Sequence, residues 1–131
     1  MKVAAINQRR LGIRNIRMMR GDLWEAVNGF RFHAILSNPP YIPAEDFRSL
    51  QEEVRREPIL ALDGGADGLA FYRRICADAL RHLYADGFLL MEVGAGQEGP
   101  VRELMIQAGF TDIAIREDFR TIPRMIMGRH A

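Results

Sequence analysis

Residues 34–44 read AILSNPPYIPA, and this stretch joins an apolar strand to an abrupt, rigid end. The short apolar run over residues 32–37 is typical of a strand that is covered on both faces of a sheet. It stops at Asn38 and two prolines, which have no backbone N–H and fix their own φ angles. Each proline also restricts the preceding residue to extended geometry. The sequence therefore predicts a buried strand whose carboxyl end carries a rigid polar motif.

Upstream of this strand, the pattern predicts one helix, one strand and one turn. Residues 3–11 resemble the last turns of a helix that Gly12 closes as a C-terminal cap. Residues 15–20 alternate apolar and polar side chains, which indicates a strand. The segment GDLWEAV, residues 21–27, indicates a turn that leads into a short helix.

Downstream, a long loop from Pro39 to about Asp67 precedes four further elements. Residues 68–85 carry apolar side chains at helical spacing, so an amphipathic helix is expected there. The remaining elements are expected as a strand at 88–93, a helix at 98–108 and two closing strands at 112–118 and 122–128. Strands that alternate with helices predict an α/β fold with a layered, mostly parallel sheet. The two closing strands are so close in sequence that we expect them to be antiparallel neighbours.

The composition predicts one globular domain over residues 1–131, without a bias towards nucleic acid or membrane. Eighteen basic and seventeen acidic residues give a net charge of +1, so no overall field recruits either partner. No apolar run approaches the roughly 18 residues that span a bilayer, and the N-terminus has no signal-peptide core. The single cysteine, Cys76, fits a reducing compartment. We therefore expect a cytoplasmic protein.

The Asn-Pro-Pro-Tyr motif offers hydrogen-bond acceptors at a strand end, where parallel sheets bind ligands. The prolines cannot donate, so the side-chain oxygen of Asn38 and nearby main-chain carbonyls are the available groups. Tyr41 adds a flat wall, and Pro40 stiffens the motif. A planar NH2 group fits this site, because two fixed acceptors would hold its two hydrogens and orient the nitrogen for attack.

Other candidate sites are weaker. The three histidines, His33, His82 and His130, are too dispersed to form a zinc site, so no metal is expected. Cys76 lies on the apolar face of the predicted helix and is interpreted as a core residue. The glycines of DGGADG, residues 63–68, do not form the G-x-G-x-x-G pattern of a dinucleotide loop.

With these residues in view, the chain resembles the class I S-adenosylmethionine-dependent methyltransferases that carry an Asn-Pro-Pro-Tyr motif. It is most similar to the protein-(glutamine-N5) methyltransferases of the HemK family, which modify peptide chain release factors. The segments RGDLWEAV, AILSNPPYIP, EVRREPILALDGGADGLAFYRRI, GFLLMEVGAGQ and IPRMIMGR carry this resemblance, and the third is the most diagnostic. The family commonly has a glycine where this chain has Thr121.

The resemblance implies a role for each matching residue. Asp22 would accept from the adenine amino group of S-adenosylmethionine, and Leu23 would lie alongside the ring. Asn38 and the Pro39 carbonyl would hold the amide nitrogen of a substrate glutamine, and Tyr41 would pack on the amide. Asn38 would also face the cofactor. Glu92 and Gln97 also match the family, and we expect them to support these residues rather than to contact the substrate.

The resemblance also implies a partial Rossmann-like fold that lacks the first two strands of the family. The glycine-rich turn that holds the methionine end of the cofactor is not among these residues. We therefore expect this chain alone to bind S-adenosylmethionine weakly or not at all and to be inactive. Exposed sheet edges would favour self-association.

Three alternatives to a release factor glutamine methyltransferase remain open at this point. A ribosomal-protein glutamine methyltransferase would use the same motif. A DNA or RNA methyltransferase would place the exocyclic amine of a flipped adenine against the same acceptors, although the near-neutral charge counts against nucleic acid. The chain could also be a non-catalytic fragment.

Overall fold

The computed structural model describes residues 2–131, apart from the side chains of Glu53 and Arg55. The chain divides into two compact units, one that ends at Phe30 and one that runs from Arg31 to Ala131. Each unit is described by itself. The assignment of residues 1–131 to one catalytic domain therefore stays a prediction.

The N-terminal unit contains the predicted helix but not the predicted strand. Helix α1 (Lys2–Arg10) is followed by Gly12 in a left-handed conformation with φ +64°, which confirms the glycine cap. Residues 15–20 form no strand, so that prediction was wrong. Alternation alone cannot make a strand, because its backbone groups need a neighbouring strand to pair with. Instead, the Ile16 carbonyl accepts a hydrogen bond from Gln8 Nε2 at 2.9 Å. The predicted short helix is present as the 3₁₀ helix η1 (Leu23–Val27).

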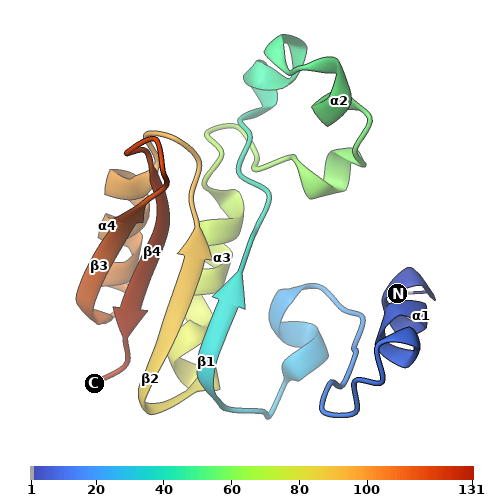
Figure 1. Ribbon diagram of the computed structural model, residues 1–131. Helices are drawn as coiled ribbons and strands as arrows, with labels where there is room; N and C mark the ends of the chain where they lie inside the picture. The colour runs from blue at the N-terminus through green and yellow to red at the C-terminus, as the bar shows by residue number, and fades with distance from the viewer. Residues whose placement is uncertain (1) are drawn as a thin grey trace. The chain divides into compact units, whose positions relative to one another are not determined.

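The second unit is built on a four-stranded sheet in the order β1-β2-β4-β3 (Figure 1). The strands are β1 (Phe32–Ser37), β2 (Leu83–Glu92), β3 (Thr111–Glu117) and β4 (Pro123–Arg129). Strands β1 and β2 pair in parallel, whereas β4 runs antiparallel to both β2 and β3. The α/β class and the antiparallel closing pair are confirmed. The expectation of a mostly parallel sheet was wrong for the described sheet, in which only the β1–β2 pairing is parallel.

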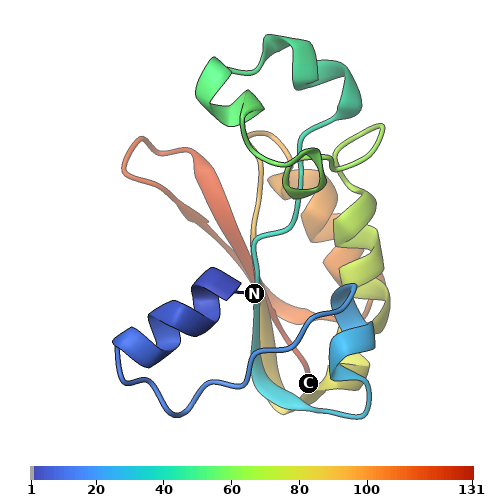
Figure 2. The same ribbon diagram turned by 90° about the vertical axis from the view of Figure 1, so that its right-hand side faces the viewer.

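Two helices, α3 (Ala70–Ala79) and α4 (Glu98–Gln107), lie on the same face of the sheet (Figure 2). Their apolar positions meet the inward side chains of the strands, and the largest fully buried side chains come from both layers. These side chains are Tyr72, Leu83, Leu89, Met91, Val93, Val101, Met105 and Ile126. On β1, however, His33 and Leu36 are exposed, and Leu36 is 70% accessible. The expectation that this strand is covered on both faces was therefore wrong for the described molecule.

Helix α3 ends earlier than the sequence pattern predicted. It stops at Ala79, a 3₁₀ turn η4 (Leu80–His82) follows, and Leu83 already pairs with Phe32 in the sheet. Strand β2 therefore begins five residues before the predicted start at residue 88. Asp86 lies within β2 although it has φ +63°, and hydrogen bonds to the C-terminus hold this part of the strand. The Asp86 N–H donates to the His130 carbonyl at 2.9 Å, and the His130 N–H donates to the Gly87 carbonyl at 2.8 Å.

The long loop after β1 contains three short helical turns, η2 (Ala44–Ser49), α2 (Glu52–Arg55) and η3 (Ile59–Ala61). The loop returns to its own start through Ile42, which forms an isolated parallel bridge with Asp63. The Ile42 N–H donates to the Leu62 carbonyl at 3.0 Å, and the Gly64 N–H donates to the Ile42 carbonyl at 2.9 Å. These two bonds hold the end of the loop against the Asn-Pro-Pro-Tyr motif.

Candidate active site

The Asn-Pro-Pro-Tyr motif begins directly after the carboxyl end of β1. Ser37, the last residue of β1, pairs with Met91 of the parallel strand β2. The loop Gly94–Gln97 follows the end of β2 at the same edge of the sheet, since parallel strands end at a common edge (Figure 1). The structure thus brings Asn38–Tyr41 together with Glu92 and Gln97.

Hydrogen-bond acceptors at the start of the motif have no partner among the described residues. The Asn38 side chain is exposed, and no hydrogen bond between described residues involves it or the Pro39 carbonyl. The carbonyls of Tyr41 and Ile42, further along the chain, are already occupied. Tyr41 accepts from Gln97 Nε2 at 2.9 Å, and Ile42 accepts from the Gly64 N–H. The open acceptors are therefore at the beginning of the motif, as a site for an NH2 group requires.

A cavity of about 290 Å³ lies against this motif. The volume is at the lower end of the range for small-ligand pockets. The four residues of the motif form one side, and the returning loop forms the other. Its lining residues are Asn38, Pro39, Pro40, Tyr41, Ile42, Val54, Glu57, Ala61 and Leu62.

Tyr41 is held as a neutral phenol at the inner end of the motif. Its hydroxyl donates to Glu92 Oε1 at 3.2 Å. Burial raises the pKa of Tyr41, and the nearby Glu92 carboxylate raises it further because it disfavours a second negative charge. The Tyr72 hydroxyl donates to the Glu92 main-chain carbonyl at 2.9 Å, and burial raises the pKa of Tyr72 as well. Glu92 therefore positions Tyr41 rather than contacting the cavity.

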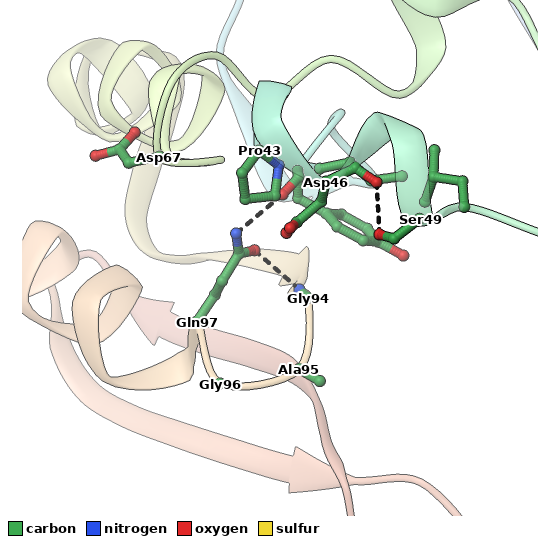
Figure 3. Close-up of a pocket in the computed structure, with 11 residues that line it drawn as sticks. Pro43, Asp46, Ser49, Asp67, Gly94, Ala95, Gly96 and Gln97 are labelled. Carbon is green, nitrogen blue, oxygen red and sulfur yellow. Dashed lines mark hydrogen bonds between the residues drawn. The ribbon is translucent and has the colours of Figure 1, made fainter. Parts of the chain in front are cut away.

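Gln97 holds the main chain of the same tyrosine from the other side. Figure 3 shows its carboxamide beside Gly94, within a second hollow of about 610 Å³. Gln97 Nε2 donates to the Tyr41 carbonyl at 2.9 Å. The Gly94 N–H donates to Gln97 Oε1 at 3.2 Å. Tyr41 and Ile42 separate this hollow from the smaller cavity, since both residues line each of them. Asp46 and Asp67 add carboxylates to its lining, and Asp67 pairs with Arg73, which lowers the pKa of Asp67 to about 2.

The two residues predicted only for cofactor binding lie in the N-terminal unit. Asp22 is exposed and directly precedes η1, and Leu23 has a left-handed backbone with φ +47°. A non-glycine residue in that conformation is strained, which is common at ligand sites. The carboxylate and the apolar side chain have the chemistry that an adenine ring requires. Their roles and those of Asn38, Pro39, Pro40 and Tyr41 in binding or catalysis stay predictions.

The sequence reasoning missed the loop residues that complete the cavity. Val54, Glu57 and Leu62 line it, although they were not singled out from the sequence. The glycines of residues 63–68 were the available signal. A Cβ added at Gly64 would lie 2.8 Å from the Tyr41 backbone, and one at Gly68 would lie 2.5 Å from the Tyr41 carbonyl oxygen. Such close approach indicates that the loop returns to the motif.

Other chemistry is limited in the described part of the chain. The side chains that the structure describes include no group of three or more histidine, cysteine or acidic residues that could hold a metal ion. Cys76 is buried in α3, and burial raises the pKa of its thiol to about 12, so it is a core residue. No helix in the described range is long and apolar enough to cross a membrane.

Comparison with known proteins identifies the relatives of this chain. No protein-family model matches it. The chain is 43% identical over 128 residues to the release factor glutamine methyltransferase of Geobacter sulfurreducens, with 97% of this chain and 45% of the relative aligned. It is 40% identical to the same enzyme of Pseudomonas aeruginosa, over 98% of this chain and 47% of the relative. This chain belongs to the release factor glutamine methyltransferase family. It spans about half the length of the curated relatives that it matches.

A second group of relatives carries a different substrate in its name. The ribosomal protein uL3 glutamine methyltransferase of Bradyrhizobium diazoefficiens is 44% identical over 99 residues, which cover 75% of this chain and 31% of the relative. Both groups are glutamine methyltransferases. The family assignment therefore rests on the longer alignments to the release factor enzymes.

Solved structures confirm the predicted fold class. A methyltransferase from Pyrococcus furiosus has a TM-score of 0.68 over 98% of this chain and 56% of that chain, at 17% identity, which supports the fold alone. The release-factor-specific protein-(glutamine-N5) methyltransferase from Alicyclobacillus acidocaldarius is 30% identical, with a TM-score of 0.53 over 82% of this chain and 54% of that chain. This chain thus has an α/β, partial class I methyltransferase fold with a mixed sheet.

Proposed function

We propose that this chain carries the acceptor-amide site of a release factor glutamine methyltransferase. The reaction would transfer a methyl group from S-adenosylmethionine to the side-chain amide nitrogen of a glutamine. The observation that carries the proposal is the pair of open acceptors, Asn38 Oδ1 and the Pro39 carbonyl, beside a 290 Å³ cavity. A primary amide supplies the two hydrogens that this pair can hold.

S-adenosylmethionine, when bound, supplies an electrophilic methyl group on a positively charged sulfur. Asp22 would accept from its adenine amino group, Leu23 would lie on the ring, and Asn38 would lie between cofactor and substrate. Asn38 Oδ1 and the Pro39 carbonyl would each accept one amide hydrogen and thereby orient the nitrogen. Such fixed dipoles favour the geometry in which the nitrogen gains positive charge.

The balance of the reaction needs no metal and no strong base. A nitrogen–carbon bond forms while the carbon–sulfur bond breaks, and the amide nitrogen loses one of its two protons. The departing proton would face Asn38 Oδ1 or the Pro39 carbonyl before it passes to water. Tyr41, whose pKa is raised, would remain a neutral phenol against the amide plane rather than act as the base.

The protein substrate proposed from the relatives is a peptide chain release factor, which would place the reaction in the cytoplasm. The similarity to the uL3 enzyme makes a ribosomal protein the other candidate substrate. It ranks second because that alignment covers less of this chain than the alignment to the release factor enzyme. An adenine in nucleic acid is a weaker candidate, since the net charge is only +1.

The test is a nuclear magnetic resonance titration of the labelled chain with a short peptide that has a central glutamine. We expect saturable shift changes at the Asn38 side-chain amide and at Tyr41. The same peptide with a central glutamate should cause none, because a carboxylate has no hydrogens for these acceptors. Asn38→Ala should abolish the response to the glutamine peptide.

Adenosine in the same titration distinguishes the nucleic-acid alternative. Shifts at Asn38 with adenosine and none with the glutamine peptide would overturn the proposal. With cofactor added, methylation of a purified release factor or of uL3 would decide between the two protein substrates.

A further inference from the structure

We propose that Gln97 is a positioning residue for the acceptor motif and acts through the main chain of Tyr41. Its Nε2 donates to the Tyr41 carbonyl at 2.9 Å, and its Oε1 accepts from the Gly94 N–H at 3.2 Å. Figure 3 shows both bonds within the larger hollow. This inference rests on the proposed function, because it concerns how the Asn38 and Pro39 acceptors are kept in place.

The two bonds tie the motif to strand β2 at a second point. At its start, the motif continues from Ser37, which pairs with Met91 of β2. At its end, Tyr41 is tied through Gln97 to Gly94, which lies two residues beyond the end of β2. Between these two anchors stand Pro39 and Pro40, which have little conformational freedom. The open acceptors therefore lie on a stiff segment that is fixed at both ends to one strand.

The two bonds of Gln97 require one group that donates and accepts at the same time, as a primary amide does at any pH. The Tyr41 carbonyl needs a donor, and the Gly94 N–H needs an acceptor, so the partners also determine which way the amide points. A carboxylate could accept from Gly94 but would oppose the Tyr41 carbonyl. An apolar side chain of similar length could do neither.

Packing around the carboxamide leaves little room for an alternative arrangement. A Cβ at Gly94 would lie 2.6 Å from Gln97 Oε1 and 3.0 Å from Tyr41 Cδ2. A Cβ at Gly68 would collide with Gln97 Nε2 and with the Tyr41 carbonyl oxygen. These two glycines allow the amide, the tyrosine main chain and the returning loop to meet at one point.

The same tyrosine has a separate restraint on its side chain. Its hydroxyl donates a hydrogen bond to Glu92, whereas Gln97 donates one to its carbonyl. The loss of Gln97 should therefore leave the ring in place and displace the main chain. Because an error of about 1 Å in the position of reacting groups lowers rates about 100-fold, a restraint on the main chain matters for the acceptors next to it.

The test uses Gln97→Glu in the full chain and the glutamine-peptide titration at pH 5 and pH 8. At pH 8 the introduced carboxyl group is ionised and cannot donate to Tyr41, so we expect peptide affinity about tenfold below that of the wild-type chain, the size of one lost hydrogen bond. At pH 5 a protonated carboxyl group can donate, and affinity should recover to within about twofold. The wild-type affinity should change less than twofold between these pH values.

The charged groups near position 97 determine where the introduced group titrates. Among the acidic residues, Asp46 and Asp67 line the same hollow and Glu98 is the next residue in the chain. Glu92 lies further away and accepts from the Tyr41 hydroxyl. Two arginines oppose these charges: Arg73 pairs with Asp67, and Arg124 lowers the pKa of Tyr41. The excess of carboxylates and the Tyr41 carbonyl should raise the pKa of the introduced group above the usual value of about 4.3. Its protonated form is then present at pH 5 and lost as the pH rises.

Gln107→Glu is the matched control, because it makes the same change at an exposed position of α4, the helix that directly follows Gln97. It should leave peptide affinity unchanged at both pH values. Gln97→Met tests the role without a new charge and should lower affinity about tenfold at either pH, with circular dichroism as the check on folding.

The outcomes separate this inference from the proposed function. A merely structural Gln97 would lower the melting temperature of the variants without a pH-dependent change in peptide affinity, and that result would overturn the inference alone. Equal affinities of wild-type chain and Gln97→Glu at pH 8 would do the same. A wild-type chain that does not bind the glutamine peptide would overturn both proposals.

Discussion

Thr121 illustrates how one residue can oppose the local backbone. It lies in the turn between β3 and β4 with φ +59°, a left-handed conformation that suits glycine and strains a β-branched side chain. The turn holds it there through several bonds to Asp118. The Thr121 N–H donates to the Asp118 carbonyl at 3.0 Å, and the Arg120 N–H donates to Asp118 Oδ1 at 2.7 Å.

We predict that Thr121→Gly stabilises the protein by about 1 kcal/mol. Relief of the left-handed strain should contribute about 1–2 kcal/mol, and the greater freedom of glycine in the unfolded chain offsets part of it. Urea unfolding measures the difference. Arg120→Gly, at a neighbour without a positive φ, is the control and should not stabilise. A less stable Thr121→Gly variant would show that the threonine side chain contributes more than its strain costs.

The buried phenols of Tyr41 and Tyr72 predict a loss of stability at high pH. Burial raises both pKa values above the ordinary value of 10.0, so the neutral forms are favoured in the folded chain. Their contribution is complete below pH 10 and is lost as the pH rises above it. Tyr72→Phe should therefore lose less stability between pH 7.5 and pH 11 than the wild-type chain does. Urea unfolding at the two pH values measures this, and an equal loss in both proteins would refute it.

At the scale of elements, the loop after β1 depends on its glycines rather than on a regular pattern. Its three short helical elements could not be predicted from periodicity, because each has at most six residues. The glycine run was visible in the sequence. Only the structure shows that Gly64 and Gly68 are needed because the loop passes close to the main chain of Tyr41.

We predict that Gly68→Ala destabilises the protein by clearly more than Gly96→Ala. Both glycines have left-handed backbones, with φ +75° and +80°, so both substitutions cost about 1 kcal/mol in strain. A Cβ at Gly96 meets nothing within 4 Å, whereas one at Gly68 meets the Tyr41 carbonyl oxygen at 2.5 Å. The clash should add about 1–3 kcal/mol. Thermal unfolding of the pair measures the difference, and similar melting temperatures would mean that the loop moves away without cost.

Element boundaries were the least predictable part of the fold. The helix at 98–108 and the closing strands were predicted within a few residues, because their patterns are clear and Gly109 follows the end of the helix. The end of α3 was missed, since Leu83 and Tyr84 continue the helical spacing although Leu83 pairs with Phe32 in the sheet. Pairing between distant strands overrode a local pattern there.

At the scale of the whole molecule, β1 is an edge strand of the described sheet. It stands at one end of the order β1-β2-β4-β3, and its Leu36 is 70% exposed. Unpaired edges with apolar side chains tend to associate. We propose that the chain self-associates through this edge.

Leu36→Lys should shift the chain towards monomer in gel filtration and light scattering at matched concentrations. A charged side chain on an edge strand opposes strand-to-strand association. Ile106→Lys, at an exposed apolar position on α4, is the control and should leave the association unchanged. Association that persists equally in Leu36→Lys would exclude this edge as the contact.

Cofactor binding by these 131 residues is predicted to be weak or absent. The sequence contains no glycine-rich turn for the methionine end of S-adenosylmethionine, whichever role Asp22 and Leu23 have. Calorimetric titration of the purified chain should show no saturable binding in the micromolar range. Micromolar binding would mean that the described residues, alone or as an oligomer, form a complete cofactor pocket.

The sequence by itself determined the α/β class, the strand before Asn38 and the acceptor motif. These depend on local properties, namely apolar runs, the fixed φ of proline and the absence of its N–H. Only the tertiary structure decided which acceptors are free, because Gln97, the partner of the Tyr41 carbonyl, is 56 residues away in the chain. It also decided that a returning loop closes the cavity and that residues 15–20 form no strand. Hydrogen bonds between distant segments carry no local signal, so folding alone reveals them.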